Sequence, residues 1–322
     1  MTQRRLRAAA VRVPGSTSNL GGGFDCVGLA VDRFLDAAFV PGAGALTVER
    51  PERGTPPGED LVALAFCRAL EQHGLAPRGV LRVRSAIPIA CGLGSSAAAL
   101  VAGSALGTLV AGSALDADAT FAFATGEEGH GDNAGASAYG GLIAAIGGME
   151  SPRAVPLELS PRVGFAFAAP PIRVSTRAAR AALPATVPHG VAAGAIARVV
   201  ALLSGLATAD PDLLQRGFED ALHVPYRLPL IPGSEDALAA ALAEGAWAGT
   251  VSGAGSGLLA VCALEEAPRV AARMASALTE RHRGEEVQSF ALRPVTEGVR
   301  SFDLGGVPAR DAAGEATPAG AD

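Results

Sequence analysis

Hydrophobic residues along the first half of the chain recur with either a strand period or a helix period. Residues 6–15, 34–42 and 45–51 are short apolar runs bounded by Gly, Pro or charged residues, which predicts three strands. In residues 59–75 the apolar positions lie three and four apart, and Gly74 follows the last full turn. This spacing predicts an amphipathic helix that ends at Gly74.

The remaining pattern predicts one more strand and two helices, and then a second set of elements. Residues 79–90 alternate as a strand does and lead into a Gly- and Ser-rich stretch, after which a helix of small residues begins near Ser95. Residues 116–129 are predicted to form another helix. The second set is expected at 163–170 (strand), at about 176–183, 189–207, 211–221 and 233–244 (helices), and at 249–264 (a Gly-rich turn between apolar runs).

A proline-rich stretch at 151–162 separates the two sets and predicts a domain boundary. We expect two α+β domains, residues 1–155 and 156–304, with a cleft between them where a small molecule would bind. The last residues, 305–322, are Gly, Ala and Pro without periodicity and are predicted to be disordered.

Composition narrows the class of protein. The chain has 322 residues, of which 49% are hydrophobic and 18% charged, as is typical of a folded globular protein. Its formal net charge of -6 and its aromatic content of 4% argue against a nucleic acid or an anionic membrane as partner. The apolar run Ala97–Gly112 is short and rich in Gly and Ser, so we interpret it as a buried helix.

The cysteines and the basic residues exclude further classes. The four cysteines lack CxxC spacing, which is typical of a reducing compartment and of neither a disulfide framework nor a zinc site. The first residues have no long apolar core, so we expect no signal peptide and a cytoplasmic location. All 26 basic residues are arginine, which excludes a Walker A loop and the strand lysine of a protein kinase.

The stretch "CGLGSSAAA", residues 91–99, has the composition of a phosphate-binding loop. Gly92 and Gly94 would let backbone amides approach a ligand closely, while Ser95 and Ser96 are suitable as an N-cap, as hydroxyl donors or as metal ligands. Free amides and the helix dipole favour an anion there. An ordinary strand-to-helix turn is the alternative interpretation.

The stretch "EEGHGDN", residues 127–133, gathers polar side chains between glycines. Glu128 is a candidate ligand for a divalent cation, which prefers oxygen. His130, Asp132 and Asn133 are candidates for binding or orienting a polar substrate. A solvated loop with a helix C-cap at Gly129 is the alternative.

Three other stretches are candidates of the same kind. Asn19 and Asp25 are polar residues in the apolar, Gly-rich segment 14–30, where a buried polar group needs a partner. Residues 251–259 form a further Gly-rich turn, and Tyr226 and Arg227 stand between prolines. Fixing so many glycines costs conformational entropy, which favours a functional reason for them.

Together these stretches resemble the homoserine kinases, members of the galactokinase, homoserine kinase, mevalonate kinase and phosphomevalonate kinase superfamily. "VPGSTSNLGGGFDCVGLA", "IPIACGLGSSAAA" and "TVSGAGSGLLAV" resemble the three superfamily motifs, in order. "EGHGDNAGASAYGG", "VSTRAARAALP" and "LHVPYRLPLIPG" resemble segments of the homoserine kinases, and the last two are not shared with mevalonate or galactose kinases. The resemblance covers residues 8–303.

The resemblance implies an α+β fold of two domains. The N-terminal domain would be of the ribosomal-protein-S5-like left-handed β-α-β type, and the C-terminal domain would be ferredoxin-like. It also implies ATP-dependent phosphorylation of the side-chain hydroxyl of L-homoserine, in threonine biosynthesis, with ATP and Mg²⁺ as cofactors and a homodimeric state.

The resemblance also assigns roles to residues. The ATP phosphates would be wrapped by Pro88, Ile89, Ala90, Cys91, Gly92, Leu93, Gly94, Ser95, Ser96, Ala97 and Ala98, and Mg²⁺ would be held by Ser96 and Glu128. Homoserine would be bound by Asn19, Asp25, His130, Asn133, Thr176, Arg180 and Arg227, with Asp25 on its ammonium and the two arginines on its carboxylate. Arginine forks suit carboxylates.

The general base is left open by the sequence. Asn133 is expected to orient the reacting hydroxyl, with the γ-phosphate receiving the proton, while Asp132 beside it is the alternative base. Three positions depart from the family pattern: Gly131 and Ser256 stand in place of prolines, and Val224 in place of a glutamate.

Two rival functions follow from the same residues. The first is a superfamily kinase for a mevalonate- or sugar-like substrate, and Arg180 and Arg227 argue against a neutral sugar, which would give them nothing to pair with. A catalytically altered kinase or binding protein for another small hydroxylated acid would share the fold, but the presence of both Ser96 and Glu128 argues against it.

Overall fold

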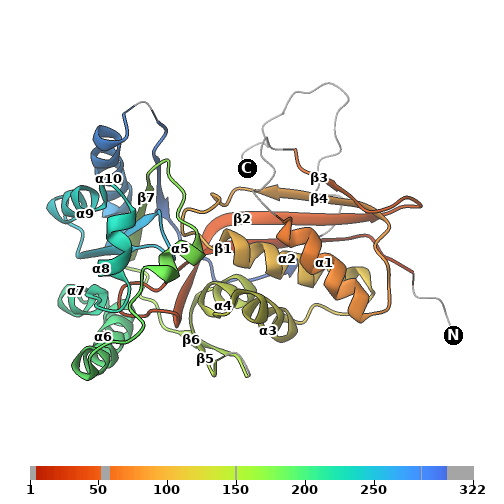
Figure 1. Cartoon of the computed structure of the whole chain (residues 1–322), viewed down its shortest axis with the longest axis horizontal. Helices are drawn as coiled ribbons and strands as arrows, with labels where there is room; N and C mark the ends of the chain where they lie inside the picture. Colours follow the sequence, from red (N-terminus) through yellow and green to blue (C-terminus); the bar gives the residue numbers. More distant parts are fainter. Residues whose placement is uncertain (1–4, 52–58, 149–150, 284, 303–322) are drawn as a thin grey trace.

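The chain forms two β-sheets that lie one after the other along the longest axis of the molecule, each with its own helices (Figure 1). The computed structural model describes residues 5–51, 59–148, 151–283 and 285–302. The predicted α+β class is confirmed.

The first sheet contains seven strands. Its path is β11-β1-β2-β4-β3, and β5 joins β2 to β6. A long antiparallel hairpin of β1 and β2 dominates it, with a register shift between Pro14 and Gly15. The short strand β3 runs parallel to β4. The bounds are β1 Ala9–Ser18, β2 Val27–Pro41, β3 Thr47–Glu49, β4 Gly79–Ser85, β5 Leu142–Ile146, β6 Arg153–Leu157 and β11 Arg300–Ser301.

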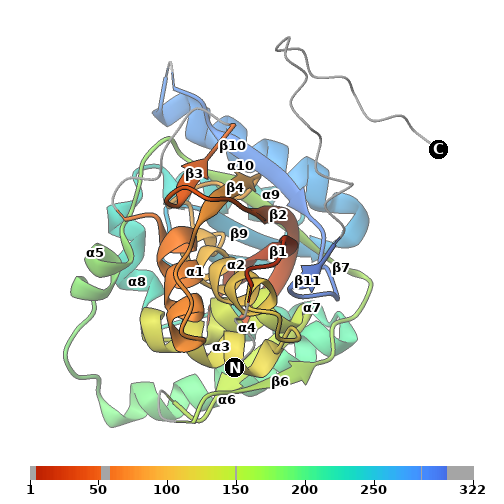
Figure 2. The same cartoon turned by 90° about the vertical axis from the view of Figure 1, so that its right-hand side faces the viewer.

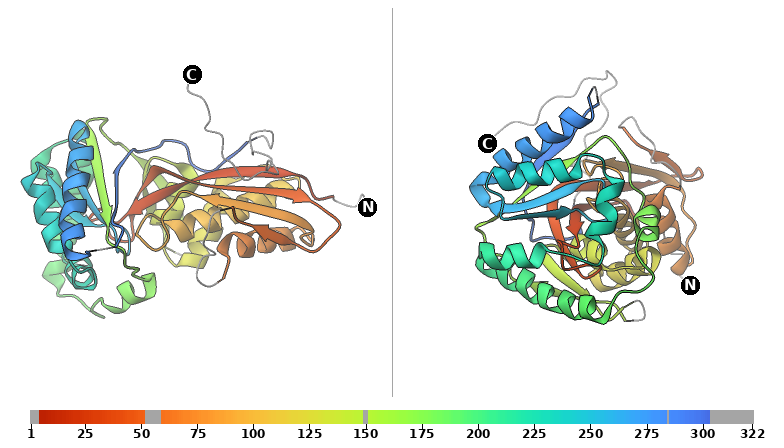
Figure 3. Two further views of the ribbon diagram at one scale, coloured as in Figure 1. Left: turned by 90° about the horizontal axis from the view of Figure 1, so that it is seen from above. Right: turned by 60° about the vertical axis from the view of Figure 1, so that its left-hand side comes forward.

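Four helices cover one face of this sheet: α1 Leu61–Gln72, α2 Ser95–Val110, α3 Ala117–Glu128 and α4 Asp132–Tyr139 (Figures 1 and 3). Figure 2 looks along the molecule from this end. Helix α2 lies in the middle of the layer and is buried over most of its length. A Cβ added at Gly103 would lie 2.3 Å from the carbonyl oxygen of Val62, so the small residues of α2 allow α1 to pack closely against it. The interpretation of this run as a buried helix is confirmed.

The second sheet has four antiparallel strands in the order β10-β7-β9-β8. Numbered along the chain this order is 4-1-3-2, which is the ferredoxin-like arrangement that was predicted. The strands are β7 Val163–Ala169, β8 Ala248–Val251, β9 Leu258–Ala263 and β10 Gln288–Leu292, and the helices are α5 Thr176–Ala181, α6 His189–Thr208, α7 Pro211–Phe218, α8 Val224–Arg227, α9 Ser234–Ala243 and α10 Ala267–Arg281.

Helix α6 lies on the outside of this second unit, packed along α7 (Figures 1 and 3). Leu202, Gly205 and Leu206 are its buried residues, whereas Ile196 and Val200 are 70% and 61% exposed. By length and composition α6 is the one helix among the described residues that is apolar enough to cross a membrane, which is weak evidence for a span. The sequence pattern placed α6 correctly but did not reveal its exposed apolar side.

Several elements differ from the sequence-based expectation. The proline-rich stretch at 151–162 contains strand β6, which among the described strands pairs with β5 alone, and an edge strand tolerates Pro156. Helices α4, α8 and α10 were not predicted: glycines obscure the apolar period of α4, α8 is a single turn, and α10 has a clear apolar period that was overlooked. The predicted tail at 305–322 lies outside the described residues.

Candidate active site

The candidate stretches meet between the two sheets. The segment after β1 contacts the turn after β8, where the side-chain amide of Asn19 donates to the carbonyl oxygen of Gly253 at 2.9 Å. The backbone N–H of Gly253 in turn donates to the carbonyl oxygen of Ser18 at 3.2 Å. Segments more than 200 residues apart therefore form one site.

The loop between β4 and α2 has the open backbone geometry of an anion site. Gly92 and Gly94 have φ values of 79° and 64°, and Gly94, not Ser95, is the N-cap of α2. The first hydrogen bond of the helix runs from the amide of Ala98 to the carbonyl of Gly94, so the amides before Ala98 have no acceptor in the helix. Such amides and the helix dipole favour a phosphate.

The two glycines also have a packing reason that was not foreseen. A Cβ at Gly92 would lie 2.0 Å from the carbonyl oxygen of Ser252, and one at Gly94 would lie 2.2 Å from the hydroxyl of Ser16. Any side chain at either position would therefore displace a neighbouring segment, whether or not a ligand is bound.

The Gly-rich turn after β8 holds this loop in place. The hydroxyl of Ser252 donates to the carbonyl oxygen of Gly92 at 2.7 Å and also contacts the hydroxyl of Thr17 at 2.9 Å. The amide of Gly257 donates to the carbonyl oxygen of Cys91 at 3.1 Å. Burial raises the pKa of the Cys91 thiol, although the charge of nearby Arg173 opposes this shift. The sequence did not single out Thr17, Ser252 or Arg173.

Ser96 and Glu128 meet at the end of this loop. The Ser96 hydroxyl donates to Oε1 of Glu128, while Oε2 is buried without a hydrogen-bond partner among the described residues. Burial raises the pKa of Glu128 because the charged form is poorly solvated. A divalent cation would satisfy the orphaned oxygen. A hydroxyl and a carboxylate, completed by ligand phosphates, are the oxygen ligands that suit Mg²⁺.

His130 and Asp132 form an ion pair at the start of α4, with 2.7 Å between Nδ1 of the histidine and Oδ1 of the aspartate. Burial opposes the charge on His130, but the hydrogen bond and charge of Asp132 raise its pKa. Burial likewise opposes the charge on Asp132, but the hydrogen bond and charge of His130, with the amide of Asn133, hold its pKa below the ordinary value.

Asn133 is held on both sides of its amide group. Its Oδ1 accepts from the hydroxyl of Ser16 at 3.0 Å, and its Nδ2 donates to the hydroxyl of Ser18 at 2.8 Å. Asp132 is 1% exposed and Asn133 is 9% exposed. The start of α4 is therefore buried and not a solvated loop, whereas the helix C-cap at Gly129 that the alternative included is confirmed.

Asp25 and Arg180 pair across the cleft. Two hydrogen bonds, of 2.9 and 3.0 Å, join the guanidinium to both carboxylate oxygens. The side-chain carbonyl of Asn19 accepts the backbone amide of Asp25 at 2.9 Å and fixes the turn that carries the aspartate. Both Asn19 and Asp25 have positive φ. The two charges expected to bind opposite ends of an amino acid therefore lie side by side.

Arg227 is buried, at 2% exposure, and lies beside the same cleft. Its Nη1 donates to the carbonyl oxygen of Gly253 at 2.9 Å, and its guanidinium lies 5.1 Å from the centre of the Phe24 ring. Its Nε is buried and has no acceptor in the described part of the chain. A carboxylate ligand would supply one.

Thr176 lies on α5, one helical turn before Arg180. It is exposed at the start of α5, whose N-cap is Ser175, and no hydrogen bond joins it to another described site residue.

The three departures from the family pattern have distinct surroundings. Gly131 is the buried N-cap of α4, and a Cβ there would lie 3.0 Å from that of Ala145. Val224 packs against the apolar cluster of the second sheet. The hydroxyl of Ser256 donates to the carbonyl oxygen of Ile172 at 2.7 Å, a bond that proline could not make.

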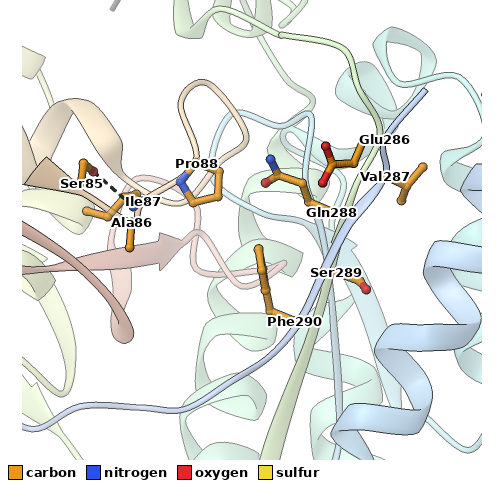
Figure 4. Close-up of a pocket in the computed structure, with 9 residues that line it drawn as sticks. All are labelled: Ser85, Ala86, Ile87, Pro88, Glu286, Val287, Gln288, Ser289 and Phe290. Atoms are coloured by element: carbon orange, nitrogen blue, oxygen red, sulfur yellow. Dashed lines mark hydrogen bonds between the residues drawn. The ribbon is translucent and has the colours of Figure 1, made fainter. Parts of the chain in front are cut away.

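An open groove borders the phosphate loop on the other side. It is lined by residues 85–88 and by 286–290, and Figure 4 shows Gln288 facing Pro88 across it. Of these lining residues only Pro88 belongs to the predicted site.

Comparisons with known proteins agree with this geometry. Residues 60–141 match the model of the GHMP kinases N terminal domain, and residues 202–280 match that of the GHMP kinases C terminal. Homoserine kinase from Synechococcus sp. (strain CC9605) is 39% identical over 291 residues, which are 86% of this chain and 91% of that protein. Homoserine kinase from Moorella thermoacetica is 40% identical over 275 residues, which are 84% of this chain and 93% of that protein.

Solved structures give the same fold. The crystal structure of homoserine kinase from Cytophaga hutchinsonii is similar with a TM-score of 0.77 at 24% identity, over 94% of this chain and 98% of that one. The crystal structure of L. major mevalonate kinase in complex with R-mevalonate is similar with a TM-score of 0.66 at 15% identity, over 91% of this chain and 98% of that one.

Fold and site together define a GHMP kinase, an enzyme that uses ATP as phosphoryl donor for a small molecule. Within that class the chain belongs to the homoserine kinases. The family resemblance and the two-domain kinase fold predicted from the sequence are confirmed.

Proposed function

We propose that the cleft between the two sheets is where this homoserine kinase transfers the γ-phosphoryl group of ATP to the side-chain hydroxyl of L-homoserine, giving O-phospho-L-homoserine for threonine biosynthesis. The observation that carries this assignment is the charge pattern of the cleft. Asp25 faces Arg180, and the buried Arg227 keeps a donor without an acceptor. A zwitterionic amino acid complements all three charges.

Binding of homoserine would replace the Asp25–Arg180 ion pair with ion pairs between these side chains and the substrate. The Asp25–Arg180 pair is about one-third exposed, so opening it costs little compared with a buried pair. The ammonium of homoserine would take the place of Arg180 beside Asp25, with Asn19 fixing the turn. The carboxylate would lie between Arg180 and Arg227, which sets the amino acid in one register for in-line transfer.

This substrate assignment is tested by removing one charged group of the substrate at a time. We expect 4-hydroxybutanoate, which lacks the ammonium, and 3-aminopropan-1-ol, which lacks the carboxylate, each to lose about 10²-fold or more in kcat/KM relative to L-homoserine, because each lacks one of the two charge-assisted contacts that orient the substrate. ADP release measured on the three alcohols gives the ratios. Equal turnover of all three would contradict the proposed site.

The phosphate end would work by position and charge neutralisation, as phosphoryl transfer requires. The amides of residues 92–97 and the start of α2 would bind the ATP phosphates. Ser96 and Glu128 would hold Mg²⁺, which when bound neutralises charge on the phosphates. The contact of Ser96 with Glu128 and the orphaned Glu128 oxygen support this assignment.

Asn133 would orient the hydroxyl of homoserine, and the γ-phosphate would receive its proton. Asp132 is a poor base, because His130 pairs with it and holds its pKa low. We therefore expect Asp132→Asn to keep measurable turnover, with a loss of about tenfold from the disturbed His130 pair, and Asn133→Ala to lose about 10²-fold or more. Single-turnover rates at saturating homoserine compare the two variants. If Asp132→Asn abolished turnover while homoserine affinity stayed intact, Asp132 would be the base.

We also propose that the enzyme is a homodimer that buries the exposed side of α6. Ile196 and Val200 are large apolar residues exposed on this helix, which supports an interface there. We expect the double variant Ile196→Asp, Val200→Asp to be monomeric in light scattering at concentrations where the unmodified enzyme is a dimer. Leu242→Asp, at a 51% exposed position on α9, is the matched control and should leave the dimer intact. A dimer that survives the double variant would place the interface elsewhere.

Two further proposals concern location and organisation. A cytoplasmic location is supported by the four cysteines, all described and all free thiols. The division into domains 1–155 and 156–304 is supported by the two separate sheets, although β6 of the first sheet extends past residue 155 and β11 returns to pair with β1.

A further inference from the structure

We propose that His223 is a positioning residue that fixes the guanidinium of Arg227, so that its free edge faces the carboxylate of the substrate. The inference rests on the proposed homoserine site. His223 precedes α8, lies outside every set of predicted site residues, and is 0% exposed.

The two ring nitrogens of His223 have different partners. Nε2 lies 3.0 Å from the carbonyl oxygen of Gly21, and Nδ1 lies 3.3 Å from Nη1 of Arg227. A carbonyl only accepts and a guanidinium only donates. Both contacts are satisfied together by one form of the ring, the neutral tautomer with its proton on Nε2.

The surroundings keep the ring neutral. Burial lowers the pKa of His223, and the charge of Arg227 acts in the same direction. Asp220 opposes this shift from 3.8 Å, but its carboxylate already accepts the backbone amides of Leu222, His223 and Val224 at 2.7 to 3.0 Å. Asp25 is the other charged group that favours protonation.

Arg227 is thereby held along one edge. Nη1 of Arg227 donates one proton to the carbonyl oxygen of Gly253 and the other to Nδ1 of His223, so both of the Nη1 protons are used. Nε has no acceptor, and Nη2 takes part in no hydrogen bond among the described residues. An arginine fixed in this way presents the Nε–Nη2 edge, which binds a carboxylate through two parallel hydrogen bonds.

The same histidine joins the two halves of the site. Gly21 lies in the segment after β1 and Arg227 in α8, so the ring bridges both units. Phe24 stacks on the His223 ring at 4.8 Å between centroids and also lies under the Arg227 guanidinium. His223 is thus fixed in orientation as well as in protonation.

Replacing His223 with asparagine or with glutamine separates the role of Nδ1 from that of Nε2. His223→Asn keeps an acceptor near the position of Nδ1, toward Arg227, and gives up the Gly21 contact. His223→Gln keeps a donor near the position of Nε2 and gives up the contact with Arg227. We expect His223→Gln to raise the KM for L-homoserine about tenfold or more, as loss of a hydrogen bond to a charged group does, and to leave the KM for ATP unchanged.

We expect His223→Asn to restore most of the homoserine affinity, with a KM within about threefold of the unmodified enzyme. Thermal unfolding of each variant is measured alongside. Equal loss in both variants, or parallel increases in the KM for ATP and homoserine, would show a merely structural role. If His223→Gln does not fold, a large increase in the homoserine KM of folded His223→Asn would by itself overturn the proposal. Failure of the unmodified enzyme to phosphorylate homoserine would instead contradict the proposed function.

Discussion

Replacing Glu128 with glutamine is expected to reduce kcat by about 10²–10³-fold, because the substitution removes a charge that stabilises the transition state. The carboxylate contacts Ser96, and its second oxygen is buried without a partner in the described part of the chain. The Mg²⁺ concentration needed for half-maximal activity should rise in the same variant. Initial rates over a Mg²⁺ titration at saturating ATP and homoserine measure both effects.

Glu127→Gln is the matched control for this experiment. Glu127 precedes Glu128 on α3 but pairs with Arg68 at the surface, away from the phosphate loop. Its replacement should change kcat by less than about twofold. Burial raises the pKa of Glu128, so its charge costs folding energy and Glu128→Gln should melt no lower than the unmodified enzyme. An unchanged Mg²⁺ dependence in Glu128→Gln would remove Glu128 from the metal site.

Arg180→Ala is expected to reduce kcat/KM for homoserine by about 10²-fold, which corresponds to about 3 kcal/mol for a lost bidentate contact with a carboxylate. The KM for ATP should not change, because α5 contacts the substrate end of the cleft. The loss should appear mainly in the KM for homoserine, since the carboxylate is bound equally in the ground state and the transition state.

Arg177→Ala serves as its control, because Arg177 is an exposed residue of the same helix. This variant should retain the kinetics of the unmodified enzyme. If Arg180→Ala raised the KM for ATP as much as that for homoserine, Arg180 would act on the phosphates and not on the amino acid.

The sequence was most informative where local chemistry is unusual. The Gly-rich stretch at 91–96 predicted an open loop before a helix, and the structure has positive φ at Gly92 and Gly94 there. Strand and helix periods placed most elements because they depend on neighbours in the chain. Those elements then bring the predicted polar residues Asn19, Asp132 and Asn133 into one buried region.

Contacts between distant segments could not be predicted from the sequence. Asp25 and Arg180 are 155 residues apart, and their pairing depends on how the two sheets pack. The same holds for His223, which lies in the segment "LHVPYRLPLIPG" but whose contact with Gly21, 202 residues away, no local pattern reveals. The second reason for Gly92, its contact with Ser252, also depends on tertiary packing. Sequence patterns indicate which residues are chemically unusual, whereas folding decides which of them meet.

The most direct test of the central claim is the choice of acceptor alcohol. The purified enzyme is supplied with ATP and Mg²⁺, and ADP release is followed with L-homoserine, L-serine, L-threonine or mevalonate at equal concentrations. A site built around Asp25, Arg180 and Arg227 predicts that L-homoserine has the highest kcat/KM and that mevalonate, which lacks an ammonium, has none that is measurable. Turnover of mevalonate without turnover of L-homoserine would contradict the account.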